Sequence, residues 1–159
     1  MISILIVCAG NICRSPALAA ALQKLVAEKG LTGRVCIDSC AITPSFLGAP
    51  ADPRMVAAAH KRGIHIDHKA KIFEESYFKV FDPIIAVDHE TLQKLQALAP
   101  GDAKAKIHLA TEFSALYKDK EMDDPYFDGE AGFEKIMDMC EEIAQGIFSK
   151  FLSFYTQEN

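Results

Sequence analysis

Two side chains near the N-terminus have the types and spacing of a reactive thiol and its anion-binding partner. Cys8 ends a short apolar run, and Arg14 follows it after five intervening residues. A thiolate is the reactive form of cysteine, and a nearby guanidinium favours it over the thiol. The planar fork of arginine binds two oxygens of a phosphate-like anion. The pair therefore predicts a nucleophilic cysteine beside a bound anion.

The residues that follow Cys8 are suited to surround such an anion. Gly10 permits a backbone angle or a close approach that a side chain would block, and Asn11 tolerates the left-handed region. An isolated cysteine and arginine at this spacing are more often unrelated, an inert buried thiol and a surface guanidinium. The glycine, asparagine, serine and proline near this pair favour an anion-binding site over that alternative. We expect the anion-binding loop to comprise Ala9, Gly10, Asn11, Ile12, Cys13, Arg14 and Ser15.

The elements on either side give this loop its position. Residues 2–7 are apolar and branched, as in a buried parallel strand, and residues 17–26 have leucines at helical spacing. Ser15 is a plausible N-cap, and Pro16 suits the first helical position. A loop between a strand's carboxyl end and a helix N-terminus concentrates free N–H groups and positive dipole. The local pattern therefore predicts an anion site.

Strands and helices alternate along the remaining chain, which is typical of a parallel sheet. Further strands are expected at 34–39, 82–88 and 106–110, and helices at 52–60, 90–98 and 130–154, with a short helix within 74–80. The last helix has an apolar face made by Phe133, Ile136, Met137, Cys140, Ile143, Ile147, Phe148 and Phe151. No linker or repeat divides residues 1–159, so we expect one α/β domain with a four-stranded parallel sheet.

Of three Asp-Pro pairs, one is well placed for acid–base chemistry. Asp52 precedes a helix, so capping explains it completely, and Asp82 enters a strand at its amino end, away from the usual site. Asp124 lies in the long aperiodic segment 117–129, and such loops are often functional. A carboxylic acid held there can protonate a departing phenolate.

Neighbouring carboxylates in that segment leave an alternative open. Asp123 adjoins Asp124, and further acidic residues make a merely solvated loop possible. Pro125 biases the residue before it, Asp124, toward an extended backbone and so toward a fixed side-chain direction. This favours Asp124 over Asp123 as the acid.

Val7 to Pro16 resemble the loop V-C-x-G-N-I-C-R-S-P of the low-molecular-weight protein tyrosine phosphatases and match every defined position. The resemblance extends along the chain to Asp38-Ser39, Gly48, Arg54, Gly63-Ile64, His68, Asp88 and Asp124-Pro125-Tyr126. It implies a doubly wound domain with helices on both sheet faces and the phosphate-binding loop between the first strand and first helix. The implied activity is hydrolysis of phosphotyrosine through a phosphocysteine intermediate, with Asp124 as the acid.

The same resemblance suggests supporting roles. Ser15 would donate its hydroxyl to the Cys8 thiolate, and Ser39 and Asp88 would hydrogen-bond Asn11 or the loop backbone. His68 would support the loop, although a lone histidine is more often only structural. Substrate-rim positions depart from the family pattern at Ala9, Ser45 and Lys71, while aromatic side chains are available at Phe46, Tyr126 and Phe127.

Five cysteines, an odd number, do not suggest a secreted disulfide framework. Cys13 could pair reversibly with Cys8 and protect it from oxidation, or could be a small buried hydrophobe. Cys36, Cys40 and Cys140 are interpreted as structural. None has zinc spacing with a histidine partner, so we expect no metal and no cofactor.

Composition limits the partners. A net charge of −5 argues against nucleic acid, and no segment has the length of a membrane span or signal peptide. The expected location is the reducing cytoplasm. The expected partners are a phosphotyrosine-containing protein or peptide, and phosphate or oxyanion inhibitors.

Three other functions fit the loop less well. A thiol-dependent arsenate reductase would need a redox cysteine pair near residues 80–90, which contain none. Phosphoarginine phosphatases tend to have threonine where this chain has Ile12. A phosphocarrier or phosphotyrosine-binding module would have no use for Asp124.

Overall fold

The computed structural model describes residues 1–157 and contains a four-stranded parallel sheet in the order β2-β1-β3-β4. The strands are β1 (Ile2–Cys8), β2 (Val35–Ala41), β3 (Ile84–Ala86) and β4 (Ile107–Leu109). The central strand β1 pairs with β2 along its whole length and with β3 from Leu5 to Val7. Their carboxyl ends meet at one edge of the sheet, where open α/β folds bind their ligands.

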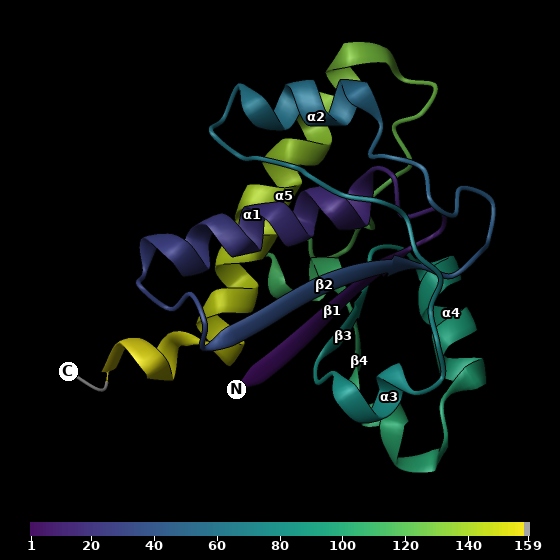
Figure 1. Ribbon diagram of the computed structural model, residues 1–159, viewed down its shortest axis with the longest axis vertical. Coiled ribbons are helices and arrows are strands. Elements are labelled where there is room, and N and C mark those ends of the chain that lie inside the picture. The colour runs from purple at the N-terminus through teal and green to yellow at the C-terminus, as the bar shows by residue number, and fades with distance from the viewer. Residues whose placement is uncertain (158–159) are drawn as a thin grey trace.

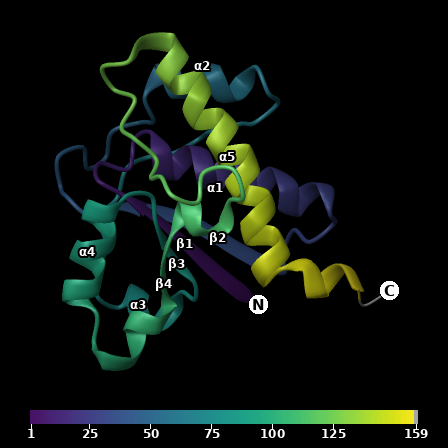
Figure 2. The same cartoon turned by 180° about the vertical axis from the view of Figure 1, so that it is seen from behind.

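Helices cover both faces of this sheet, which confirms the predicted α/β architecture (Figures 1 and 2). On one face lie α1 (Arg14–Glu28) and α5 (Gly129–Phe151), with α2 (Pro53–His60) packed against α5. The other face is covered by α3 (Tyr77–Val80) and α4 (His89–Leu98). Three 3₁₀ segments, η1 (Gly101–Lys106), η2 (Ala110–Phe113) and η3 (Ser153–Gln157), complete the described elements.

The alternation of side chains along β1 produces two cores. Ile4 and Ile6 are fully buried in the cluster formed with α1, α2 and α5, whereas Leu5 and Val7 are buried in the cluster formed with α3 and α4. Cys8, which follows at the carboxyl end of β1, belongs to the first cluster and is 2% exposed. The strand therefore places the thiol on the face of the sheet covered by α1 and α5, directly before α1.

Several local predictions need correction. Helix α1 begins at Arg14 with Cys13 as its N-cap, so Ser15 lies inside the first turn, where its hydroxyl is free to bond other groups. Strand β2 continues to Ala41, and β3 is shorter than predicted. Of the three cysteines interpreted as structural, Cys40 and Cys140 are buried in the two cores, whereas Cys36 is exposed and packs in neither. Among residues 1–157, no helix has the length and apolar character needed to cross a membrane.

Candidate active site

The loop that joins β1 to α1 directs several polar groups at the sulfur of Cys8. The Ser15 hydroxyl oxygen lies 2.9 Å from Cys8 Sγ, and the backbone N–H of Asn11 donates to Sγ at 3.2 Å. Ser15 reaches back to the thiol because it lies in the first turn of α1. Both groups can stabilise a thiolate by hydrogen bonding.

Asn11 holds the loop in shape through hydrogen bonds in three directions. Its backbone has φ of +58°, in the left-handed region, and its side-chain amide donates to the hydroxyls of Ser15 at 2.8 Å and Ser39 at 3.0 Å. Its Oδ1 accepts from the backbone N–H of Lys71 at 3.1 Å. The predicted contact between Ser39 and the loop is thus present, through a side chain that is fully buried.

His68 contacts the same asparagine from the opposite side. Its Nε2 lies 2.9 Å from both the backbone oxygen and Oδ1 of Asn11. Both of these oxygens are acceptors, so Nε2 carries a hydrogen. Burial lowers the pKa of His68, which favours the neutral ring despite the hydrogen bond to Asn11. His68 therefore contacts the loop and not the thiol.

Arg14 is fixed by an acid and a carbonyl. Its Nη1 donates to Asp88 Oδ2 at 2.7 Å and to the backbone oxygen of Met122 at 2.8 Å. Asp88 also caps α4 by accepting from the backbone N–H of Thr91. The expectation that Asp88 bonds Asn11 or the loop backbone is therefore wrong: the carboxylate binds the guanidinium. Both contacts use Nη1, so Nε and Nη2 of Arg14, which bond no group within residues 1–157, are available for an anion.

Asp124 reaches the same site from the distant segment between η2 and α5. The buried Met122 anchors this segment, because its N–H donates to Val87 and its carbonyl accepts from Arg14. Two residues later, Asp124 Oδ1 accepts from the backbone N–H of Tyr126 at 3.1 Å. Asp124 lines the cavity above Cys8, and Asp123 is exposed outside the lining.

The cavity has a volume of about 260 Å³ and lies over the anion-binding loop. Its lining includes Thr43, Ser45 and Phe46 from the segment after β2. It also includes Asp52, Asp124, Tyr126, Phe127 and Phe133. All three predicted rim aromatics thus line the cavity, although Phe127 is 92% exposed.

The ring of Phe46 packs against the backbone of Gly10 at this rim. A Cβ at position 10 would lie 2.6 Å from the ring of Phe46, so the ring packs directly over the glycine. The close approach that the structure shows at Gly10 is therefore to a rim aromatic. Phe46 therefore supplies an aromatic ring next to Ser45 in the cavity lining.

Cys13 makes a contact that does not decide between its two interpretations. Its thiol donates to the sulfur of Met55 at 3.4 Å, and burial raises its pKa well above the ordinary range. Both Cys8 and Cys13 are free thiols. Reversible pairing between them remains a prediction from their shared loop.

Sequence reasoning missed two contacts of the site. One is the carbonyl of Met122, which receives Arg14 and which no side-chain pattern could have indicated. The other is Arg54, noted in the sequence without a role, which binds the Asp52 carboxylate and the carbonyl of Tyr126. Capping of α2 therefore accounts for only one of the roles of Asp52. Its carboxylate accepts from the backbone N–H of Arg54 at 2.9 Å and also pairs with the Arg54 side chain.

Comparison with known proteins gives consistent matches. The family model described as low molecular weight phosphotyrosine protein phosphatase matches residues 3–154. A protein of that name from Schizosaccharomyces pombe is 39% identical over 133 residues, which cover 83% of this chain and 85% of the relative. A crystal structure of a protein tyrosine phosphatase from Entamoeba histolytica, with Hepes in the active site, superposes with a TM-score of 0.93 at 33% identity, covering 98% of this chain and 99% of the other.

A more distant structural neighbour has a different named activity. The arginine phosphatase YwlE, in a mutant form with a phosphorylated active-site serine, superposes with a TM-score of 0.83 at 22% identity, over 96% of this chain and 99% of the other. At this identity the likeness describes the fold alone.

Proposed function

Because the chain belongs to the low molecular weight phosphotyrosine protein phosphatase family, we propose that it hydrolyses phosphotyrosine in proteins through a phosphocysteine intermediate on Cys8. The observation that carries this proposal is the convergence of three groups on one cavity. Cys8 comes from the end of β1, Arg14 from the start of α1, and Asp124 from a loop more than a hundred positions away. A nucleophile, an anion clamp and a carboxylic acid are the groups that ester cleavage through a covalent intermediate requires.

In the first step the Cys8 thiolate attacks phosphorus, and the bond to the tyrosine oxygen breaks. Asp124 gives its proton to the leaving phenolate. Nε and Nη2 of Arg14, together with the N–H groups of the loop, bind the transferring oxygens and stabilise their charge. The positive end of α1 points at the same place.

In the second step a water molecule attacks the phosphocysteine. Asp124, now a carboxylate, accepts a proton from that water, and the S–P bond breaks to release phosphate. The departing Cys8 thiolate is stabilised by the Ser15 hydroxyl and the Asn11 N–H, both already within hydrogen-bonding distance of Sγ. The enzyme returns to its starting state without a cofactor.

The cavity supports an aryl substrate. Cys8 is nearly inaccessible at its base, so the phosphate must be carried on a side chain long enough to reach it. Phe46 and Tyr126 can flank a phenyl ring on the way in. Ile12, which also lines the cavity, narrows it toward a flat ester and weighs against phosphoarginine. We further propose a reducing compartment, the cytoplasm, because the nucleophilic thiol must stay reduced; cell fractionation tests this.

Steady-state kinetics on the purified protein test the proposal. We expect hydrolysis of p-nitrophenyl phosphate and of a phosphotyrosine peptide, unchanged by a chelator, and much slower hydrolysis of matched phosphoserine and phosphoarginine peptides. Cys8→Ser should abolish turnover while retaining vanadate binding, whereas Cys36→Ser, at an exposed cysteine outside the cavity lining, should leave turnover unchanged. Faster phosphoarginine turnover would favour the alternative activity, and turnover by Cys8→Ser would exclude the phosphocysteine.

A further inference from the structure

The structure points to Arg54 as a positioning residue for Asp124, a role that rests on the proposed function of Asp124 as the general acid. We infer that Arg54 joins the anion-binding loop to the acid loop, defined here as Met122 to Asp128. Arg54 touches neither the sulfur of Cys8 nor the carboxylate of Asp124 in the contacts described for residues 1–157. It acts through the backbone that carries Asp124.

The guanidinium of Arg54 makes polar contacts in two directions. Nε and Nη2 donate to the two oxygens of Asp52 at 3.1 and 2.8 Å, while Nη1 donates to the backbone oxygen of Tyr126 at 2.9 Å. The flat face of the same group lies 4.9 Å from the ring centre of Tyr126 and 4.6 Å from that of Phe133. The side chain is therefore held between α2, the acid loop and α5.

Each of these contacts continues into the site. The backbone N–H of Asp52 donates to the carbonyl of Ile12 at 2.7 Å, which connects the Asp52–Arg54 pair to the anion-binding loop. On the other side, Arg54 binds the carbonyl of Tyr126. The backbone N–H of Tyr126 in turn donates to Asp124 Oδ1. A continuous series of hydrogen bonds thus connects the loop under the phosphate with the carboxyl above it.

Asp124 lies between two anchors. On the amino side, Met122 is buried and bound by Val87 and Arg14. On the carboxyl side, Arg54 binds the carbonyl of Tyr126, a residue that is 44% exposed. Loss of Arg54 would leave the second end of this short segment less constrained. A proton donor must lie within hydrogen-bonding reach of the leaving oxygen, and small displacements of a catalytic group are costly.

Arginine is the residue type that this position requires. Two parallel donors bind the Asp52 carboxylate while a third, in the same plane, is directed at a carbonyl. Lysine has a single ammonium and cannot span both partners in that geometry. Glutamine retains one donor group and loses the charge, so Arg54→Gln removes the connection while keeping a polar side chain.

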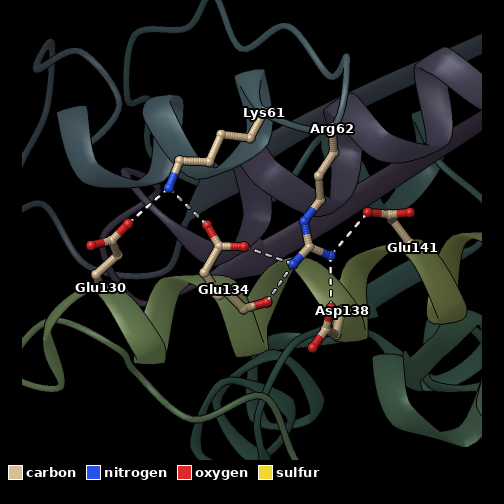
Figure 3. Close-up of polar contacts among 6 residues, drawn as sticks. All are labelled: Lys61, Arg62, Glu130, Glu134, Asp138 and Glu141. Carbon is tan, nitrogen blue, oxygen red and sulfur yellow. Dashed lines mark hydrogen bonds and ion pairs between the residues drawn. The ribbon is translucent and has the colours of Figure 1, made fainter.

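A second arginine offers a matched control. Arg62, just after α2, donates to Glu134, Asp138 and Glu141 of α5, and Lys61 binds Glu130 and Glu134 (Figure 3). This network, drawn in Figure 3, joins α2 to α5 without touching Tyr126 or Asp124. Because these contacts do not involve Arg54, we expect α2 to stay docked when Arg54 is changed. Arg62→Gln therefore loosens the same pair of helices without affecting the acid loop directly.

The test compares kcat/KM across aryl phosphates whose leaving groups range from phenol to dinitrophenol. kcat/KM reports the cleavage of the aryl ester, in which Asp124 donates its proton. For Arg54→Gln we expect a ~10- to 100-fold loss on phenyl phosphate, the range that a misplaced catalytic group costs, and almost none on dinitrophenyl phosphate. Arg62→Gln should retain the wild-type dependence on leaving group. Arg54→Lys should fall between wild type and Arg54→Gln.

A double-mutant cycle separates positioning from any direct role. In an Asp124→Asn background, Arg54→Gln should cause little further loss on phenyl phosphate, because the group that it positions is already gone. An equal loss on all leaving groups, a full additional loss in the Asp124→Asn background, or the same leaving-group effect from Arg62→Gln would overturn the inference. Absence of aryl phosphate hydrolysis by the wild-type protein would instead refute the proposed function.

Discussion

Arg14 and Asp88, 74 positions apart in the sequence, form an ion pair in which Nη1 lies 2.7 Å from Oδ2. Both side chains are largely buried, and Nη1 is also bound by the carbonyl of Met122. One edge of the guanidinium is therefore held by the protein, and the other edge faces the cavity. The pair orients the anion clamp before any phosphate binds, which is the condition for electrostatic stabilisation without reorganisation.

Replacing Asp88 by asparagine should weaken anion binding. The new side chain would still cap α4 at Thr91, since asparagine is as good an N-cap as aspartate, but it loses the charge that pairs with Arg14. Without that charge the guanidinium is less firmly oriented for the anion, and small displacements of a binding or catalytic group are costly, so we expect vanadate inhibition to weaken by roughly tenfold. Inhibition constants measured alongside circular dichroism would separate this effect from misfolding. Unchanged vanadate binding would contradict it.

The same substitution should change the pH dependence of stability. Burial by itself raises the pKa of Asp88, but the hydrogen bonds from Thr91 and the ion pair with Arg14 outweigh it and leave the pKa lowered. A carboxyl whose pKa is lower in the folded state stabilises that state above its unfolded pKa, about 3.9, and loses this contribution as the pH falls. The difference in unfolding free energy between wild type and Asp88→Asn should be largest near neutral pH and shrink below about pH 4.

Urea denaturation at a series of pH values measures that difference. Asp102→Asn, at an exposed position in η1, is the matched control and should change the unfolding free energy by less than ~0.5 kcal/mol at any pH. A wild-type advantage over Asp88→Asn that persisted undiminished at low pH would show that packing, and not the ion pair, explains it.

Asn11→Ala should cost more stability than most single changes. It removes the amide that bonds Ser15, Ser39 and the Lys71 backbone, and it places alanine at φ of +58°. Unsatisfied buried groups and left-handed strain together predict a loss of ~2–4 kcal/mol. Asn11→Gly removes the same hydrogen bonds without the backbone strain, so it should be less damaging than alanine by ~1 kcal/mol before the added flexibility of glycine is counted. Thermal or urea unfolding compares the two, and an alanine variant more stable by the full ~0.5–1 kcal/mol that glycine flexibility costs would be inconsistent with backbone strain.

Gly146→Ala tests the packing of the long helix α5. A Cβ at this position would lie 1.7 Å from the backbone oxygen of Phe113, so the helix or the 3₁₀ turn η2 must move. Alanine normally stabilises a helix interior relative to glycine by ~1 kcal/mol, yet here we expect destabilisation of ~1–3 kcal/mol. Gly101→Ala, where no atom lies within 4 Å of the added Cβ, should be close to neutral in the same urea titration. A stabilised Gly146→Ala would show that the backbone approach is not a constraint.

The part of the site that local residue types predict most directly is the segment of contiguous residues after β1, whereas Asp124 and the rim aromatics needed the family resemblance as well. Cys8 through Ser15 form one loop between one strand and one helix, so their residue types and the two flanking elements together indicate what they surround. The partners of Arg14 were not predictable, because Asp88 and Met122 reach it from separate segments and one contributes only a carbonyl. Ser15 was misassigned as an N-cap for a related reason: its hydroxyl binds a sulfur and an amide of the preceding loop.

The contact of Arg54 with Tyr126 could not be predicted from the sequence for the same reason. Its neighbour Asp52 was recognised as a helix cap because capping depends on residues two or three positions away. The contact between Arg54 and Tyr126 spans 72 positions and depends on how α2 and the acid loop are packed. Periodicity and spacing carry no information on such a contact.

The assignment of the acid is tested by two neighbouring carboxylates. Asp124→Asn keeps an amide oxygen that can still accept from the Tyr126 N–H, so the loop should retain its shape while losing its transferable proton. We expect kcat/KM to fall by ~10²–10⁴-fold on phenyl phosphate and phosphotyrosine peptide, and much less on dinitrophenyl phosphate, whose leaving group needs no proton. The basic limb of the pH–rate profile, which reports deprotonation of the acid, should flatten.

Asp123→Asn removes the same charge one residue earlier, from a side chain that lies outside the cavity lining. If net charge near the cavity were what mattered, the two variants would behave alike. If the position of a proton above Cys8 matters, Asp123→Asn should keep the wild-type rate on every leaving group and both limbs of the pH profile. A larger loss from Asp123→Asn would move the acid to that residue, and wild-type behaviour of both variants would mean that a group outside this loop protonates the phenolate.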